Sequence, residues 1–370
     1  MAARPVTRRA AVANLPAGAA APRPPVRDFS GGAGFTIEWD VRPVYDFMFS
    51  LSEDAGSTDD LPAADRRWLT DARASLPQAL GASVGRLFES EACIHLASLA
   101  VERPEIRTAA QFVDALATLS AADVFRAIFL EVTRDEAQER LLLQALDGDA
   151  DVVDELAERL PDWRRGEAIE MLRAPDAAAA DIVTALQAWA ERFGQIEDRV
   201  AAMLERDFDA RAADRATLTG SDLVERTTGG IRWLSEPGIR RVILAPSYFS
   251  RPYNFLLGGA DWRFFGYPIA DGALDAVDPL APPQSSVRLH RALGDETRLR
   301  ILKLLAGRDL YLTEIAQLLE LSKPTIKHHL ALLRSAGLVT ITESGTVMYY
   351  SLRRERLDDA ATELKAFLID

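Results

Sequence analysis

A short run near the C-terminus of the chain combines small hydroxyl side chains with positive charges. It lies within residues 321–342, a stretch that contains no acidic residue. Hydroxyl groups hydrogen-bond to base edges and phosphates, and cations neutralise phosphate charge. The run is therefore a candidate for direct contact with duplex DNA, provided that one exposed face presents its side chains together. Its members are Ser322, Lys323, Thr325, Lys327 and His328.

The helix predicted over residues 323–335 would present such a face. At about 100° per residue, the side chains of Ile326, Leu330 and Leu333 share one direction and are expected to enter the core. Most of the cationic and hydroxyl side chains lie roughly 90° or more from that direction. Ser322 is expected to cap the N-terminus of this helix.

Further elements follow the order of a winged helix-turn-helix domain. A helical hairpin with an ordinary solvated face is the alternative, and the strand-turn-strand and closing helix favour DNA binding. The first and last helices are expected to bury a dimer interface. We also expect Arg298 and Arg334 to contact phosphates, and His329 to pack. The elements are helices at Val287–Leu293, Glu296–Leu305 and Glu314–Leu319, a hairpin at Leu338–Leu352 and a helix at Leu357–Ile369.

Residues 286–352 resemble the ArsR family of winged helix-turn-helix repressors. The resemblance rests on the runs L-G-D-E-T-R-L-R-I-L from Leu293, L-S-K-P-T-I-K-H-H-L from Leu321 and L-R-S-A-G-L-V from Leu333. It covers less than a quarter of the chain. It implies a homodimer that binds an imperfect palindromic operator in double-stranded DNA, with an effector that changes DNA affinity.

The chain departs from the family pattern in two places. Many members bind metal through cysteines before the recognition helix, or through His and carboxylate ligands on the last helix. Here Leu310–Ile315 has no cysteine and the last helix has no histidine, so no metal site is expected. The wing turn, Glu343–Thr346, lacks the basic residue often found there, and Arg353 and Arg354 are candidates to compensate.

Charge is distributed unevenly along the chain. The net charge is −13, but residues 28–283 carry −20, residues 284–370 carry +2, and residues 1–27 hold five arginines and no acid. An acidic body would repel DNA phosphates and orient the molecule on DNA. Composition predicts four segments: a disordered tail at 1–28, an acidic domain at 29–275, a proline-rich linker at 276–285 and a winged helix-turn-helix domain at 286–370.

The acidic domain is predicted to be helical up to about Leu218 and to end in a small antiparallel sheet. Residues 176–218 show helical spacing without proline, which is compatible with one long helix. Aromatic residues are concentrated in the sheet segment and could line a pocket for an apolar or planar ligand. Packing against helices is the alternative, and it is favoured for most of them. The candidates are Trp233, Tyr253, Trp262 and Phe264.

The sequence offers few groups for catalysis or cofactor binding. Cys93 is the only cysteine, which excludes an internal disulfide framework and is typical of a reducing, cytoplasmic compartment. Gly31–Gly34 lacks the strand and helix context of a nucleotide-binding loop, so no cofactor is expected. The sequence contains no run of about 18 apolar residues, so no membrane span is predicted.

The sequence as a whole predicts a mainly α protein with small β elements. A C-terminal winged helix-turn-helix domain would follow a larger helical domain that ends in a small antiparallel sheet. The predicted function is a dimeric transcriptional regulator, a repressor, whose helix 323–335 reads the major groove and whose N-terminal domain senses a non-metal ligand or partner. One alternative is a DNA-tethered scaffold, which needs an exposed apolar patch. The other is a fused enzyme, which needs clustered catalytic residues that the sequence does not show.

Overall fold

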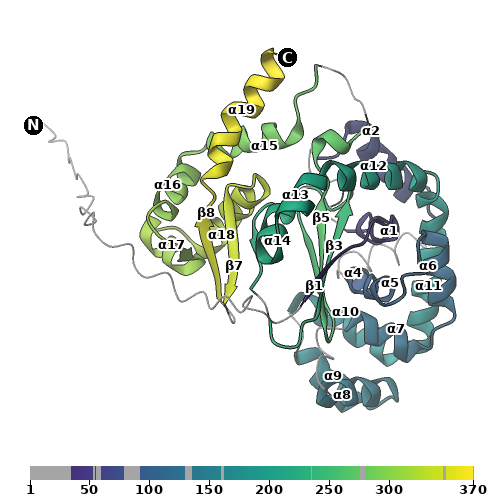
Figure 1. Ribbon diagram of the computed structural model, residues 1–370. Helices are drawn as coiled ribbons and strands as arrows, with labels where there is room; N and C mark the ends of the chain where they lie inside the picture. The colour runs from purple at the N-terminus through teal and green to yellow at the C-terminus, as the bar shows by residue number, and fades with distance from the viewer. Residues whose placement is uncertain are drawn as a thin grey trace, which may run out of the picture.

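A computed structural model describes residues 35–369, except 53–54, 56–59, 79–91, 130–135, 160–161, 235, 276–279 and 345–346. The chain forms a large helical body, on the right in Figure 1, and a smaller C-terminal domain, on the left. Two four-stranded sheets accompany the helices among the described residues, so the predicted fold class of a mainly α protein with small β elements is confirmed. Within the described ranges, no helix has the length and apolar character to cross a membrane.

Helices form most of the body. Several begin at polar caps, such as Thr108, whose hydroxyl accepts a hydrogen bond from the backbone N–H of Gln111 at 3.2 Å. The body helices are α1 (Val44–Phe49), α2 (Ala63–Ala74), α4 (Ala92–Leu96), α5 (Ser98–Glu102), α6 (Ala109–Ala117), α7 (Ala121–Ile128), α8 (Glu136–Leu146), α9 (Ala150–Glu158), α10 (Asp162–Arg173), α11 (Pro175–Phe193), α12 (Glu197–Ala210), α13 (Ala212–Thr217) and α14 (Gly220–Thr228).

Residues 176–218 form α11, α12 and α13 rather than one long helix. The first break follows Gly194, whose backbone N–H still donates to the carbonyl oxygen of Ala190 at 2.9 Å. Helical apolar spacing continues across the break because both helices bury their faces in the same core, with Trp189 on α11 and Val200 on α12. Periodicity alone therefore did not reveal the interruption.

The body sheet has the strand order β1-β3-β5-β4. β1 (Thr36–Trp39), β3 (Arg241–Ser247) and β5 (Trp262–Pro268) run parallel, and β4 (Phe255–Gly258) is antiparallel to β5. Only the β4–β5 pair is antiparallel, so the prediction of an antiparallel sheet is wrong for the other strand pairs. β1 reaches β3 only after the long helical segment, and such a crossover leaves no local sequence signal.

The two faces of this sheet belong to different cores. Phe264 faces the large cluster formed by α1 and most of the body helices. Leu244 and Phe265 face a smaller cluster that includes Val224 of α14. The sheet is thus covered on both sides, which explains why its strands are apolar nearly throughout.

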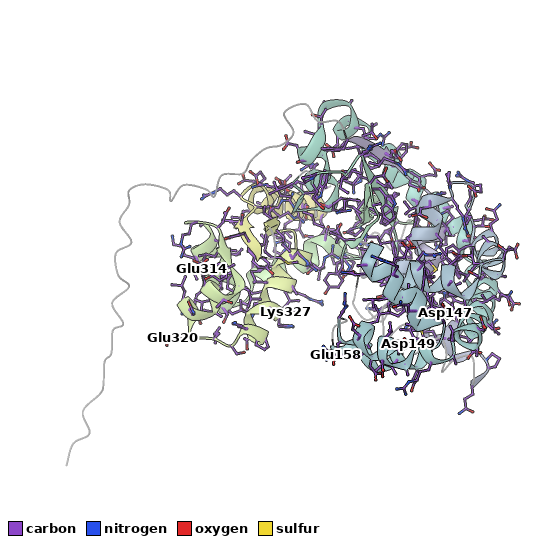
Figure 2. All side chains as sticks on the ribbon, turned by 90° about the horizontal axis from the view of Figure 1, so that it is seen from below. Asp147, Asp149, Glu158, Glu314, Glu320 and Lys327 are labelled. Atoms are coloured by element: carbon purple, nitrogen blue, oxygen red, sulfur yellow. The ribbon has the colours of Figure 1, made fainter. Side chains whose placement is uncertain are left out.

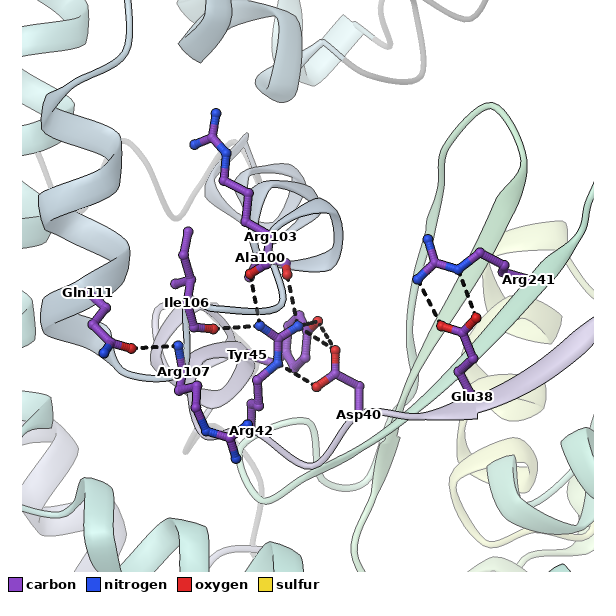
Figure 3. A network of polar contacts seen from close by, with 10 residues as sticks. All are labelled: Glu38, Asp40, Arg42, Tyr45, Ala100, Arg103, Ile106, Arg107, Gln111 and Arg241. Atoms are coloured by element: carbon purple, nitrogen blue, oxygen red, sulfur yellow. Dashed lines mark hydrogen bonds and ion pairs between the residues drawn. The ribbon is translucent and has the colours of Figure 1, made fainter.

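A buried arginine connects the end of β1 to the helices beside it. The guanidinium of Arg42 donates to the carbonyl oxygens of Ala100 at 2.8 Å and Ile106 at 2.5 Å. It also forms an ion pair with Asp40, which follows β1 (Figure 3). Because Arg42 is only 3 % exposed, these bonds satisfy buried carbonyl groups around α5 and fix β1 against the helical layer.

The C-terminal domain has the element order of a winged helix-turn-helix. Its core includes Leu289, Ile301, Ile315 and Leu330. The first helix begins at Gln284, so the end of the predicted proline-rich linker is helical, while residues 276–279 of that linker lie outside the described ranges. The elements are α15 (Gln284–Leu293), α16 (Glu296–Leu305), β6 (Leu310–Tyr311), α17 (Leu312–Leu319), α18 (Lys323–Ser335), β7 (Val339–Ser344), β8 (Val347–Leu352) and α19 (Glu355–Ile369).

A short strand of the body joins the sheet of the C-terminal domain. β2 (Ile231–Arg232) pairs in parallel with β7, which gives the order β2-β7-β8-β6. The two residues before it, Gly229 (φ +72°) and Gly230 (φ +129°), adopt backbone conformations that favour glycine. The Gly230 carbonyl oxygen accepts from the backbone N–H of Ile341 at 2.9 Å. The two domains are therefore joined by backbone hydrogen bonds as well as by the chain.

Candidate nucleic-acid interface

The helix-turn-helix places α18 through local sequence signals. Ser322 caps its N-terminus, with its hydroxyl accepting from the backbone N–H of Thr325 at 3.3 Å. Glu320 ends α17 in the left-handed region at φ 57°, which turns the chain sharply between the two helices. After α18, Gly337 at φ +70° ends the helix, and its N–H donates to the Arg334 carbonyl oxygen at 2.8 Å.

The buried side of α18 agrees with the sequence prediction. Ile326, Leu330 and Leu333 are buried in the core of the domain. Their burial fixes the rotation of the helix about its axis, because the three side chains lie on one stripe. The opposite side must then face away from the domain.

The five predicted contact residues between Ser322 and His328 are all exposed on that opposite side. The hydroxyl oxygens of Ser322 and Thr325 lie 2.7 Å apart at the helix N-terminus, so either hydroxyl can donate a hydrogen bond to the other. Figure 2 shows Lys327 at the border of the C-terminal domain, with Glu320 of the same domain and Glu158 of the body labelled on either side. The structure thus brings Ser322, Lys323, Thr325, Lys327 and His328 to one free surface.

His329 lies at the edge of that surface. Its side chain is half-buried, and its Nδ1 atom lies 3.8 Å from the Asp295 carboxylate, which is the N-cap of α16. Burial lowers the pKa of His329, and the Asp295 charge opposes this shift. The side chain therefore packs between α16 and α18, as expected from its position on the helix.

Arg298 is half-buried outside α18, whereas Arg334 is exposed at the C-terminal end of α18. The guanidinium of Arg298 donates to the carbonyl oxygens of Ala292 at 2.9 Å and Arg291 at 2.7 Å, so it caps the end of α15. Arg334 is on the last turn of α18, and its Cζ atom lies 5.9 Å from the ring centroid of Tyr253 in the body.

The arginines after the wing do not replace a basic residue at its tip. They follow the end of β8, whereas the turn, with residues 345–346 outside the described ranges, lies at the other end of the hairpin. Arg353 donates to the carbonyl oxygens of Gly229 at 2.6 Å and Gly337 at 3.2 Å. Arg354 donates to the Ala306 carbonyl oxygen at 2.8 Å. The expected compensation is wrong because a six-residue strand separates the two ends.

The aromatic candidates for a ligand pocket do not converge on one cavity. Trp262 and Phe264 are buried in the large core of the body. Trp233 is buried on the other face of the sheet, where it contacts Phe265. Tyr253 is half-buried and lines a cavity between the two domains. Three of the four therefore pack as core residues.

Sequence reasoning missed the polar contacts that join the domains. The carboxylate of Glu225 in α14 accepts from the Thr340 hydroxyl of β7 at 3.2 Å and forms an ion pair with Arg232 at 2.8 Å. Arg288 of α15 forms an ion pair with Asp60 of the body. The glycine pair before β2 was the only local signal, and it marked the junction without identifying its partners.

Comparison with known proteins places the C-terminal domain. The family model described as "Bacterial regulatory protein, arsR family" matches residues 295–340. The transcriptional repressor SdpR of Bacillus subtilis is 37% identical over 80 residues, which are 22% of this chain and 89% of SdpR. The transcriptional activator HlyU of Vibrio cholerae is 35% identical over 83 residues, covering 22% of this chain and 70% of HlyU. The match to a solved structure of Vibrio cholerae HlyU covers 24% of this chain and 95% of the HlyU chain, with 31% identity and a TM-score of 0.20. The chain is a transcriptional regulator with a DNA-binding helix-turn-helix, and through this domain it belongs to the ArsR family.

Proposed function

We propose that the protein is a dimeric, cytoplasmic repressor that inserts α18 into the major groove of a specific operator. The observation that carries the proposal is the separation of the two sides of α18. One side is buried through Ile326 and Leu330, and the other presents Lys323, Thr325 and Lys327 to solvent. An exposed helix N-terminus with hydroxyls and cations can reach both base edges and phosphates.

The set of residues proposed to contact DNA is smaller than the set expected from the sequence. We assign them to the exposed half of α18 and give Arg298 and Arg334 no part in them. The Arg298 guanidinium already donates to two backbone carbonyls. Arg334 lies eleven residues after Lys323, which is about 16 Å along the helix axis. The assigned residues are Ser322, Lys323, Thr325, Lys327 and His328.

Dimerisation is proposed through α19 and α15. The two helices pack together, and Figure 1 shows α19 continuing past α15 to the C-terminus. Leu364, Leu368 and Ile369 of α19 are 38 %, 69 % and 78 % exposed. A second copy of the chain would cover these side chains, and a two-fold dimer matches an imperfectly palindromic operator.

We propose that the body senses a non-metal ligand or partner and transmits the change to the DNA-binding domain. The support is the direct connection between α14, β2 and the wing through Glu225, Thr340 and the β2–β7 pairing. A shift of α14 would therefore displace β7, and with it the wing relative to α18. The coupling expected for such a device is about 1–3 kcal/mol.

Selection from a random duplex library by the purified full-length protein tests the proposal. We expect enrichment of an imperfect palindrome whose half-sites lie about 10 base pairs apart, or a multiple of that spacing. A promoter reporter that carries the enriched site should lose expression when the protein is present. A Lys323→Ala/Lys327→Ala variant should not enrich the site. Failure of the native protein to enrich any sequence at low salt would contradict the proposal.

A further inference from the structure

A cavity of about 240 Å³ lies between the body and the winged-helix domain. The body contributes the end of α14, the loop that carries Tyr253, and the two glycines before β2, Gly229 and Gly230, which we call the hinge. The winged-helix domain contributes the end of α18, the residue after β8 and the first turns of α19. The volume is large compared with the roughly 10–15 Å³ that admits one water molecule. A ligand in this cavity would contact both domains at once.

The lining of the cavity is strongly positive. It contains four arginines and one carboxylate, that of Asp359. Two of the arginines have acidic partners. Arg288 forms an ion pair with Asp60, and Arg356 forms ion pairs with Glu363 and, at 3.5 Å, with Asp359. Arg288 and Arg356 are therefore already paired with acidic side chains.

The other two arginines, Arg334 and Arg353, have no carboxylate within ion-pair distance among the described residues. The guanidinium of Arg334 is exposed and donates no hydrogen bond there; its contact is with the ring of Tyr253. Arg353 uses Nη1 for two carbonyl oxygens, which leaves the rest of its guanidinium for another acceptor. Burial lowers the pKa of Arg353; the charges of Glu225 and Glu355 oppose this shift, and those of Arg356 and Arg226 add to it. An anion in the cavity would give both arginines a negatively charged partner at ion-pair distance.

We propose that this cavity binds a small molecule through an oxyanion group, a phosphate ester or a carboxylate, held by Arg334 and Arg353. The planar fork of a guanidinium matches two oxygens of either group, and the hydrogen bonds formed are charge-assisted. The site is recessed between two domains and admits a small ligand. This assignment specifies the ligand class of the proposed sensing function and rests on that function. The bound anion would be the effector, held between the body and the end of α18.

Calorimetric titration of the full-length protein in the absence of DNA tests this assignment. Inorganic phosphate and malonate serve as the two probes, with sodium chloride at matched ionic strength as the blank. Saturable binding of phosphate alone indicates a phosphate ester, and binding of malonate indicates a carboxylate. Because no DNA is present, failure here leaves the DNA-binding proposal intact, and failure of DNA binding leaves this result intact.

Two variants locate the bound anion. Arg334→Gln should weaken binding of the effective probe by about tenfold or more, because it removes a charged donor to the anion. The variant should stay folded, because the Arg334 side chain is exposed and has no hydrogen bond to lose among the described residues. Arg353→Lys keeps the charge but loses the fork, and it should also weaken binding. Arg107→Gln removes an exposed arginine of the body away from the cavity and should bind as the native protein does.

Three outcomes would overturn the assignment. The first is no saturable binding of either probe up to about 10 mM. The second is equal binding by the native protein and Arg334→Gln, or an equal loss in Arg107→Gln. The third is an Arg334→Gln variant that weakens duplex binding but binds the probe normally, which would mean that this arginine contacts the DNA backbone instead.

Discussion

The Nη1 atom of Arg353 lies 2.6 Å from the carbonyl oxygen of Gly229, so the residue after the last wing strand is bonded to the hinge of the body. The same atom donates to Gly337 at the end of α18, at 3.2 Å. One guanidinium thus joins the hinge, the wing and the recognition helix. Any rearrangement of the body relative to the DNA-binding domain has to change these bonds.

Replacement of this arginine should loosen the connection between the domains. Arg353→Met removes both hydrogen bonds from a charged donor, and the free energy of unfolding should fall by about 1–3 kcal/mol. Arg354→Met is the matched control, because Arg354 is exposed and donates only to Ala306 within the winged-helix domain. Urea denaturation followed by fluorescence measures both. A smaller loss in the Arg353 variant than in the control would contradict the assigned role.

Lys327 is expected to contribute one phosphate contact per bound protomer. Lys327→Ala should weaken binding to all duplex sequences and lower the slope of log affinity against log salt by about 0.9 for each protomer. Lys365→Ala removes the same charge from the exposed side of α19 and should leave the slope unchanged. Fluorescence anisotropy over a salt series distinguishes the two, and an unaltered slope in Lys327→Ala would remove this residue from the interface.

Glu320 should be a site of local strain in the helix-turn-helix. Its φ of 57° costs about 1 kcal/mol for a residue with a side chain, and glycine avoids this cost. Glu320→Gly should therefore raise the free energy of unfolding by up to about 1 kcal/mol, reduced by the greater flexibility of glycine in the unfolded chain. Glu320→Ala, which keeps the strain and removes the same charge, is the control. Thermal denaturation should place the glycine variant above the alanine variant.

Asp46 should make stability depend on pH. It is fully buried, and burial raises the pKa of its carboxyl to about 7, although the Phe249 N–H and the Ser247 hydroxyl each donate to it at 2.7 Å. An unfolded aspartate has a pKa of about 3.9. Between these values the folded state keeps a proton that the unfolded state releases, so the free energy of unfolding falls as pH rises through this window.

Asp46→Asn removes this ionisation and keeps an oxygen acceptor. The variant should lose the corresponding part of the pH dependence and be more stable than the native protein above about pH 7, by an amount on the order of a few kcal/mol. Denaturant titrations at a series of pH values between 4 and 8 measure the difference. Parallel curves for the two proteins would show that the carboxylate is not the group responsible.

The apolar end of α19 should control the oligomeric state. Leu364→Asp/Leu368→Asp places charges in the proposed interface, where each leucine would contribute about 1.5–3 kcal/mol when fully buried. The dimer dissociation constant should rise by more than tenfold. Thr362→Asp introduces a charge about 200° around the helix from Leu364 and should have little effect. Sedimentation equilibrium gives the constants, and a native protein that is monomeric at all concentrations would exclude this interface.

The sequence by itself determined the local features of the DNA-binding domain. Asp295 and Ser322 cap α16 and α18 as predicted, because capping depends on a side chain and a backbone N–H three residues away. The stripe of Ile326, Leu330 and Leu333 fixed the buried side of α18, and its exposed side followed. All of these relationships span less than four turns of one helix.

Only the tertiary structure decided the features that join distant segments. The parallel pairing of β1 with β3, the addition of β2 to the wing sheet, and the use of Arg353 at the hinge connect residues far apart in the chain. No residue pattern encodes such partners, because a strand with two buried faces is apolar whichever neighbour and direction it takes. Asp46 becomes buried only when α1 packs against the end of β3, and the arginines of the cavity come together only when the body and the winged-helix domain pack against each other.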